Sequence, residues 1–261
     1  MNTRDVTIFS GERFEVPPCI QRIDHLSTHG WQLRYGGTKL FSDHSNDGSG
    51  ARRALALAEQ HLGAEHPDVA TLYHNLGGLD HARGHFAAGE PAARRAVEIR
   101  QRALAAGHPQ VTETQFAADL AALAGVLDGQ RKYAESEPIY ERVLALFEQQ
   151  LAAGDAAAEY EIAINLNNLA ALYANTQRAP QAEPLYRRAL MIKERLLGAT
   201  HPDVAVSLNN LGVLLKGLGR VDEAAEAYGR ALAIFEATLA ADHPKLKAVR
   251  ANLLRLVKGA R

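Results

Sequence analysis

Apolar residues along most of this chain recur at spacings of three and four, which is typical of amphipathic helices. Residues 201–239 show the pattern most clearly. A first stripe carries Leu208, Leu211 and Leu215, and a second stripe carries Ala224, Tyr228, Ala231, Leu232 and Phe235. Each stripe fits one face of a helix. We therefore predict two helices here, with small alanines that let them approach closely and with Tyr228 filling the space between them.

The ends of these two helices are also marked in the sequence. Pro202 suits the first turn of the first helix, because the N–H that proline lacks would have no partner there. Gly217 and Gly219 predict a turn, and we expect Asp222 to cap the second helix. The segment is therefore predicted to form a helical hairpin.

A histidine–proline pair recurs along the chain, beginning at His66, His108, His201 and His243. The first two of these histidines are 42 positions apart, and so are the last two. A fixed period of this size predicts stacked repeats. Because each repeat of such a stack contacts only its neighbours, the stack offers one extended surface, which favours binding over catalysis.

Further hairpins follow from the same pattern. Residues 159–197 fit through Leu166, Leu169, Tyr173, Ala182, Tyr186 and Ala189, and residues 66–104 fit through Tyr73, Leu76 and Ala96, with Ala93 in place of the tyrosine. Residues 108–151 fit through Leu123, Ala134 and Tyr140, with about five extra residues before Leu123. Residues 51–62 are predicted to be an isolated second helix and residues 244–258 an isolated first helix. The stack would then hold about ten helices.

The first 50 residues have a different composition. Apolar and polar residues alternate in Trp31–Tyr35, and Gly36 and Gly37 make a credible hairpin turn into Lys39–Phe41. We expect a small three-stranded sheet between residues 19 and 43. The stretch DHSNDGSG at 43–50 marks the boundary, so the predicted domains are a β-rich segment at 1–50 and a helical domain at 51–261.

Bulk composition excludes several classes of function. The 261 residues carry a formal net charge of −1, so the whole chain has no bias towards nucleic acid or membrane. Cys19 is the only cysteine, which fits a reducing compartment. No signal peptide and no run of about 18 apolar residues is present, so we expect a cytoplasmic protein without a membrane-spanning helix.

Sequence motifs for catalysis are missing as well. The chain has no GxxxxGK[ST] phosphate loop, no GxSxG elbow and no dinucleotide fingerprint. Its 11 histidines include His81 and His85 at helical spacing, but no HExxH motif. We therefore expect no enzymatic activity, no cofactor and no metal site.

The segment LNNLAALYANTQRAPQAEPLYRRALMIKERLLGATHPDVA (166–205) resembles tetratricopeptide repeats, in particular the 42-residue kind found in kinesin light chains and many bacterial proteins. The resemblance covers about residues 51–258. It implies a mainly α-helical fold, a right-handed α-solenoid whose inner face is lined by the first helix of each hairpin. Proteins of this family usually bind an extended peptide or a segment of a partner protein in that groove.

The residues expected to face a partner lie opposite the apolar stripe of each first helix. They are Val206, Asn209, Val213 and Lys216, the equivalent Ile164 and Asn167, and His74 and His81 in the first hairpin. An asparagine amide can both donate to and accept from a peptide backbone, and the resemblance implies this role for Asn167 and Asn209. The alternative is that both amides only satisfy neighbouring helices, as we expect for Asn168 and Asn210.

Basic residues near the C-terminal end of this face suggest the charge of the partner. Lys216, Arg255 and Lys258 would make that end of the groove mildly basic, which favours an acidic peptide. The alternative is a charged face that only contacts water.

The N-terminal segment resembles the bacterial relatives of the APETALA/ethylene-response DNA-binding domain. The matching pieces are Ile20-Gln-Arg22, Gly30-Trp31-Gln-Leu-Arg34, Phe41-Ser42-Asp43 and Arg53-Ala54-Leu55. The resemblance implies nucleic-acid contacts by Arg22, Trp31, Arg34 and Lys39. The alternative is a β-rich cap that shields the first helix of the stack. Two functions therefore stay open: an adaptor that binds a protein segment, and a DNA-binding regulator whose repeats recruit a partner.

Overall fold

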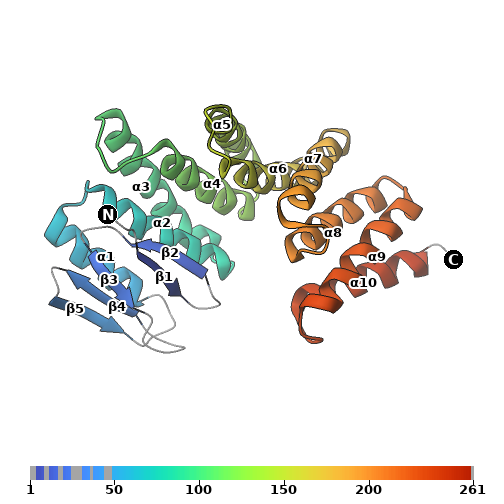
Figure 1. Cartoon of the computed structure of the whole chain (residues 1–261), viewed down its shortest axis with the longest axis horizontal. Coiled ribbons are helices and arrows are strands. Elements are labelled where there is room, and N and C mark those ends of the chain that lie inside the picture. Colours follow the sequence, from blue (N-terminus) through green and yellow to red (C-terminus); the bar gives the residue numbers. More distant parts are fainter. Residues whose placement is uncertain are drawn as a thin grey trace. The chain divides into compact units, whose positions relative to one another are not determined.

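The computed structural model describes residues 4–8, 12–16, 20–24, 31–35, 38–43 and 49–259 (Figure 1). Side chains are described from residue 50 to residue 256. Ten helices lie in this described part: α1 (Ser49–Leu62), α2 (Pro67–Ala82), α3 (Phe86–Ala105), α4 (Glu113–Gly129), α5 (Tyr133–Ala152), α6 (Ala158–Asn175), α7 (Ala179–Leu197), α8 (Pro202–Gly217), α9 (Val221–Thr238) and α10 (Pro244–Gly259). The predicted hairpins and the two isolated helices are all present. We call α2, α4, α6, α8 and α10 the first helices, and α1, α3, α5, α7 and α9 the second helices.

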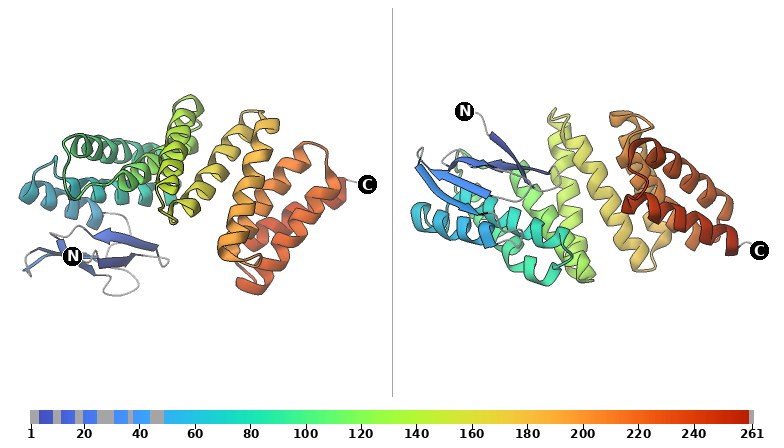
Figure 2. Two further views of the ribbon diagram at one scale, coloured as in Figure 1. Left: turned by 45° about the horizontal axis from the view of Figure 1, so that its top comes forward. Right: turned by 90° about the horizontal axis from the view of Figure 1, so that it is seen from below.

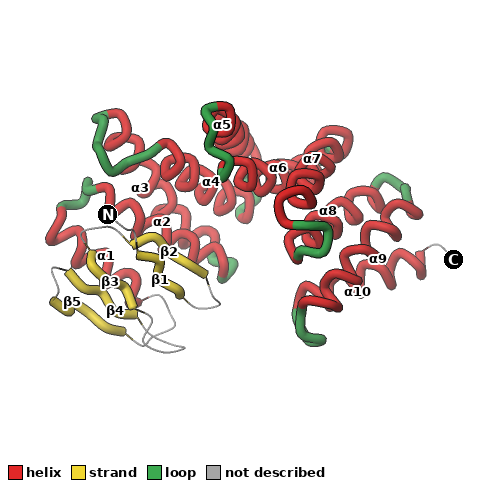
Figure 3. Tube along the Cα trace, viewed as in Figure 1, coloured by secondary structure: helices red, strands yellow, loops and turns green. Residues whose placement is uncertain are grey.

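Five strands precede the helices (Figure 3). Strands β1 (Arg4–Ile8) and β2 (Glu12–Val16) pair with each other, and β3 (Ile20–Asp24), β4 (Trp31–Tyr35) and β5 (Thr38–Asp43) form a separate antiparallel sheet in that order. The β1–β2 pair was not predicted. Gly36 and Gly37, the predicted hairpin turn, lie outside the described residues. Backbone contacts place β4 and β5 against α1, and β2 against α2.

The chain divides into two compact units, residues 1–139 and residues 140–261. In the first unit, α2 packs along α3, and α3 packs along α4. The core between α1, α2 and α3 contains Leu55, Val69, Leu72, Leu76 and Ile99. Gly77 and Ala93 face each other where α2 packs along α3: a Cβ at position 77 would lie 3.3 Å from the Cβ of Ala93.

In the second unit, α6 packs along α7, and α8 packs along α9 (Figure 2). Leu208, Leu211 and Leu215 are buried, as their spacing predicted. Tyr228 is also buried, and its ring lies so close to Gly212 that a Cβ there would be 2.8 Å from Cε1. Tyr228 therefore fills the space between α8 and α9, as predicted, and a glycine opposite it makes the room.

The recurring histidine–proline pair starts helices. Pro202 is the first residue of α8, and Nδ1 of His201 accepts a hydrogen bond from the backbone N–H of Asp203 at 3.1 Å. His66 makes the same bond at 3.2 Å in front of α2. A histidine ring nitrogen thus serves where serine or aspartate usually caps a helix.

His108 begins a turn instead of a helix. Helix α4 starts later, at Glu113, where Thr112 and Gln115 form a capping box. This displaced start accounts for the extra residues that the sequence showed before Leu123.

Two details of the sequence prediction were wrong. Ala134 is exposed, and Ser136 is the small buried residue of α5, four positions before Tyr140. Asp222 does not cap α9: Arg220 occupies the N-cap position without a side-chain cap bond, and Asp222 lies within the first turn. Each miss is a shift of two positions: Ser136 follows Ala134 by two residues, and the N-cap Arg220 precedes Asp222 by two.

Candidate functional site

The outward stripe of the first helices carries the residues predicted to face a partner. On α8, Val213 is 51% exposed and Lys216 is exposed, while Val206 and Asn209 are half-buried. On α6, Ile164 is half-buried and Asn167 is only 8% exposed. We call these residues of α6 and α8 together the α6–α8 face. It combines an exposed apolar side chain, a cation and partly covered amides.

A ladder of asparagine amides crosses this face. Nδ2 of Asn210 donates to Oδ1 of Asn167 at 3.4 Å, which joins α8 to α6. Nδ2 of Asn252 donates to Oδ1 of Asn209 at 3.0 Å, which joins α10 to α8. Nδ2 of Asn209 donates to Oδ1 of Asn210 at 3.4 Å. A partner would therefore compete with Asn210 for Oδ1 of Asn167, and the direct role of Asn167 stays a prediction.

In the first unit the equivalent position carries His74. Nδ1 of His74 lies 2.9 Å from Oδ1 of Asp119 on α4, and Nε of Arg100 on α3 donates to Oδ2 of the same carboxylate at 2.9 Å. Nη2 of Arg100 also donates to the hydroxyl of Thr71 at 3.1 Å. Arg100 and Asp119 are buried, whereas a third of the His74 side chain is exposed. This buried ion pair fixes a histidine at the surface.

His81 lies two helical turns after His74. It is exposed, and its ring packs edge-on against Phe86, with the ring centroids 5.3 Å apart. His74 is therefore partly accessible and held by a charged network, and His81 is exposed; that either contacts a partner stays a prediction.

Arg100 has a counterpart in the second unit. Lys193 on α7 follows Arg100 by 93 positions, the same interval that separates His108 from His201. Nζ of Lys193 donates to the hydroxyl of Ser207 on α8 at 3.2 Å, and both residues are buried. Burial lowers the pKa of the Lys193 ammonium, with Asp203 opposing and Lys245 adding to the effect. A buried cation thus bridges α7 to α8, with a hydroxyl where the first unit has a carboxylate.

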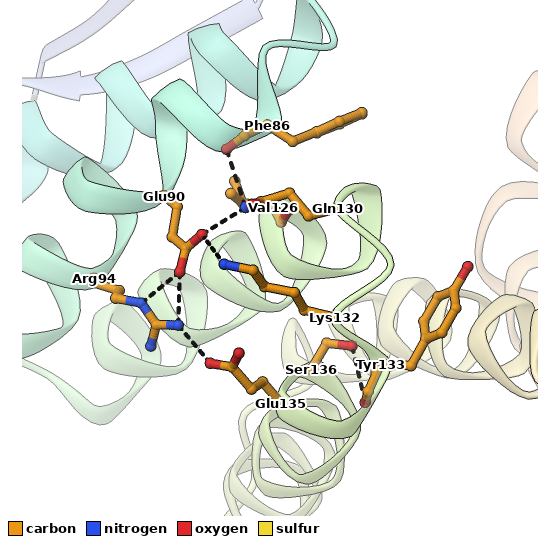
Figure 4. A network of polar contacts seen from close by, with 9 residues as sticks. All are labelled: Phe86, Glu90, Arg94, Val126, Gln130, Lys132, Tyr133, Glu135 and Ser136. Carbon is orange, nitrogen blue, oxygen red and sulfur yellow. Dashed lines mark hydrogen bonds and ion pairs between the residues drawn. The ribbon is translucent and has the colours of Figure 1, made fainter.

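Exposed charges form a second recurring network. Oε2 of Glu90 accepts hydrogen bonds from Lys132 at 2.7 Å and from Gln130 at 2.8 Å (Figure 4). Arg94 bridges Glu90 to Glu135, with 2.6 Å to the latter (Figure 4). The hydrogen bond from Lys132, with those from Gln130 and Arg94, lowers the pKa of Glu90 to about 2.

The same arrangement returns in the second unit. Glu183 accepts from Arg220 at 2.7 Å and from Arg187 at 2.9 Å, and Arg220 also binds Glu223 at 2.6 Å. Burial raises the pKa of Glu183, but the hydrogen bonds from Arg220 and Arg187 outweigh it and lower the pKa overall. These networks join successive second helices and have a structural role.

The sequence analysis missed these polar networks, although part of the signal was present. Glu90 and Arg94 recur 93 positions later as Glu183 and Arg187, so a search for charged residues at the repeat interval would have found the pair. The link from His74 to Asp119 has no such signal, because it depends on which faces of α2 and α4 meet.

Other candidate chemistry is limited. Among the described residues, no group of three or more histidine, cysteine, aspartate or glutamate side chains could hold a metal ion. Within the same residues, each helix is too short or too polar to cross a membrane. The side chains of Arg22, Trp31, Arg34 and Lys39, the predicted nucleic-acid contacts, lie outside the described residues.

Two family models, both for the tetratricopeptide repeat, match the sequence, one over residues 161–237 and one over residues 69–110. The chain contains tetratricopeptide repeats. The resemblance predicted from residues 166–205 is therefore confirmed for these segments. Neither model covers residues before 69, so the likeness of residues 20–55 to the APETALA-type domain stays a prediction.

Solved structures share the repeat fold. BtubC (BKLC) from P. vanneervenii is 24% identical, with a TM-score of 0.63 over 80% of this chain and 81% of that one. A Podosopora anserina protein with nearly identical TPR-like repeats of the kinesin light chain kind is 22% identical, with a TM-score of 0.54 over 76% and 90%. Aspartyl phosphate phosphatase F from Bacillus subtilis is 14% identical, with a TM-score of 0.64 over 80% of this chain and 50% of that one.

These identities establish the fold alone: a mainly helical solenoid of tetratricopeptide repeats. No curated protein matches the chain.

Proposed function

We propose that this protein is a non-enzymatic adaptor, in which the groove lined by the first helices of the tetratricopeptide repeats binds an extended segment of a partner protein. One observation supports this most: Val213 exposes 51% of its surface on a first helix whose opposite face is fully packed. Leu211 and Leu215 lie in the core of this hairpin, whereas Val213 leaves half of its surface exposed. A single exposed apolar side chain is common on protein surfaces, so the weight of this observation comes from its position on the same helix stripe as the amide of Asn209 and the cation of Lys216.

The amides beside Val213 suit an extended backbone. Asn209 is half-buried and lies in the asparagine ladder, which holds its carboxamide in a fixed orientation. An amide that is already oriented loses little rotamer freedom when a partner binds. Because Oδ1 and Nδ2 of Asn209 are each engaged once in the ladder, a peptide N–H or C=O would use the second lone pair of Oδ1 or the second hydrogen of Nδ2.

Charge supports an acidic partner segment. Lys216 on α8 and Arg255 on α10 are both exposed, and the structure gives neither side chain an ion pair with a described residue. These cations are free to pair with carboxylates of a bound segment. Such pairing weakens with salt, because exposed charges are screened within about 10 Å at 0.1 M ionic strength.

The N-terminal strands support a shielding role. The backbone of β4 and β5 lies against α1, a second helix without a first helix of its own. We propose that this β-rich segment caps the stack. DNA binding by Arg22 and Trp31, and a cytoplasmic location, stay predictions.

A selection experiment tests the adaptor function. The full chain is panned against a phage-displayed library of random peptides, and the enriched peptides are measured by fluorescence anisotropy. Val213→Glu is compared with Met191→Glu, a matched control because Met191 on the second helix α7 is 61% exposed. We expect Val213→Glu to weaken binding at least tenfold and Met191→Glu to leave it unchanged. The absence of enriched peptides, or equal loss in both variants, would contradict the proposal.

A further inference from the structure

Helix α10 is the last first helix of the described part of the chain, and no second helix follows it there. Leu246 and Val249 are buried in the core that α10 shares with α8 and α9. Lys247, Arg250 and Leu254 lie on a different stripe of the helix, at spacings of three and four, and all three are exposed. We call these three residues the α10 end stripe. Because Leu254 has 61% of its surface exposed, the stripe presents an apolar side chain beside two cations.

In the earlier first helices of this unit the same stripe is covered. The equivalent residues stand 42 and twice 42 positions earlier, and all of them are small or apolar and buried. They are Ala205, Leu208 and Gly212 in α8, and Ala163, Leu166 and Ala170 in α6. In α8 the second helix of the hairpin provides the cover, since the ring of Tyr228 on α9 lies against Gly212. The α10 end stripe is therefore the surface on which a second helix would pack.

The α10 end stripe differs from the face proposed for an extended segment. On α8 that face carries Val206, Asn209 and Val213, each one position after a residue of the covered stripe. One position along a helix is a rotation of about 100°. A partner on the α10 end stripe would therefore occupy a second surface, independent of the adaptor groove.

The size of Leu254 restricts what can pack on this stripe. Its place is taken by Gly212 in α8 and by Ala170 in α6, and the second helices of those hairpins carry Tyr228 and Tyr186. The ring of Tyr228 leaves no room for a Cβ at position 212, so a ring in that place would overlap the larger side chain of Leu254. A helix on the α10 end stripe therefore needs alanine or glycine where α7 and α9 have tyrosine.

The charge of α10 restricts the partner further. The sequence of this helix has five cations and no carboxylate. Nη2 of Arg250 donates to Oε1 of Glu236 on α9 at 2.8 Å, whereas Lys247 has no ion pair with a described residue. A negatively charged helix would complement this stripe, and the α10 helix of a second copy would be repelled by it.

We propose that the α10 end stripe binds an acidic amphipathic helix of a partner protein, in the place that α9 occupies on α8. Docking of this kind uses apolar residues at helical spacing, with charge setting the choice of partner. The alternative is a charged end that only contacts water, as terminal repeats need for solubility. Lys247 and Arg250 fit both. Single exposed leucines are common, but Leu254 stands at the place where α8 receives the ring of Tyr228, which favours a partner.

Helix α9 of this chain provides the probe. Its sequence is amphipathic and acidic, with four carboxylates and one cation. Two fluorescein-labelled peptides span residues 221–238, one unchanged and one with Tyr228→Ala, and their affinities for the full chain are measured by fluorescence anisotropy. We expect the alanine peptide to bind about tenfold more tightly than the tyrosine peptide, because only alanine leaves room for Leu254.

A size exchange makes the test specific. Leu254→Ala gives α10 the residue that α6 has at this place, and it should keep the melting temperature of the wild type because the side chain is exposed. With this variant the preference should reverse, so that the tyrosine peptide binds more tightly. Lys247→Glu should weaken binding of the alanine peptide about 3- to 10-fold. Lys245→Glu, at an exposed lysine of the same helix outside the stripe, is the matched control and should leave the affinity unchanged.

The possible outcomes identify the occupant. Peptides that do not bind, or an order of affinity that Leu254→Ala does not change, would overturn the proposal. A dimer in sedimentation velocity that Leu254→Ala dissociates would assign the stripe to a second copy instead, and flotation with phosphatidylserine vesicles that this variant abolishes would assign it to a membrane surface. We expect identical sedimentation of wild type and variant, and no flotation. None of these results involves Val213, so the adaptor function is tested separately.

Discussion

Nζ of Lys193 lies 3.2 Å from the hydroxyl of Ser207, at a buried contact between α7 and α8. An ammonium in such a place loses hydration, and here it gains one hydrogen bond to a neutral hydroxyl and the weaker attraction of Asp203. The equivalent contact in the first unit pairs Arg100 with the carboxylate of Asp119. The same buried position between a second helix and the next first helix therefore holds an ion pair in the first unit and a cation bonded to a hydroxyl in the second.

Replacing Lys193 by methionine should stabilise the protein. Methionine keeps the volume and removes the desolvated charge, so we expect the free energy of unfolding at neutral pH to rise by about 1 kcal/mol or more. The gain should shrink as the pH rises towards 10.5, the ordinary pKa of lysine. In that range the unfolded wild type still binds the proton that the folded state, with its lowered pKa, has released, so wild-type stability increases. Urea unfolding of both proteins at several pH values measures this; a destabilised Lys193→Met would show that the cation is favourable.

A second prediction concerns the glycine opposite Tyr228. Gly212→Ala should lower the free energy of unfolding by about 1–3 kcal/mol, because the new methyl group would overlap the buried ring of Tyr228. Gly229→Ala on α9 is the control, since a Cβ there meets no atom within 4 Å. It should stabilise the protein by about 0.5–1 kcal/mol through helix propensity. If thermal melts showed the same change for both variants, Tyr228 would not be packed against position 212.

The charge network around Glu90 predicts a pH effect. Glu90→Gln cannot ionise, so at neutral pH it should be less stable than the wild type by about 1 kcal/mol, a modest amount because Lys132 and Arg94 are partly exposed. The pKa of Glu90 is lowered to about 2 from an ordinary 4.5. The stabilisation is therefore complete above pH 4.5 and is lost as the pH falls through about 2. Urea unfolding between these pH values should show the two proteins converging, and a constant difference would exclude Glu90 as the cause.

The histidine caps give a fourth prediction. His201→Ala removes the acceptor for the backbone N–H of Asp203 and should cost about 1 kcal/mol, the usual value of a lost helix cap. His201→Asn should restore most of the loss, because asparagine is among the best capping residues. Calorimetric melts of the two variants provide the comparison. Equal melting temperatures for them would mean that His201 does not stabilise the start of α8.

Much of the helical fold was predictable, because each period of 42 residues places apolar residues at the same helix positions, so the same packing recurs. Leu211 and Tyr228 are buried as their spacing required. Helix ends were harder to place. Asp222 has the right chemistry for a cap, but Arg220 holds that position, since the preceding turn through Gly219 sets where α9 begins.

The candidate site was predictable only in part. Position within the repeat placed Val213 and Lys216 on an exposed stripe, and both are exposed. It could not show that Asn167 is largely covered by the ladder, nor that Asp119 fixes His74, because both depend on contacts between separate helices. Spacing along the sequence predicts which residues share a helix face. The residues that they contact on other helices depend on how the helices pack, which spacing does not give.

Site-specific photocrosslinking tests the central claim most directly. The full chain carries a benzophenone amino acid at Val213 on α8 or, in a separate protein, at Met191 on α7, and is irradiated with the selected peptide. The adaptor account predicts a crosslinked product from position 213 and none from position 191, as judged by mass spectrometry. Crosslinking from position 191 but not from position 213 would contradict it.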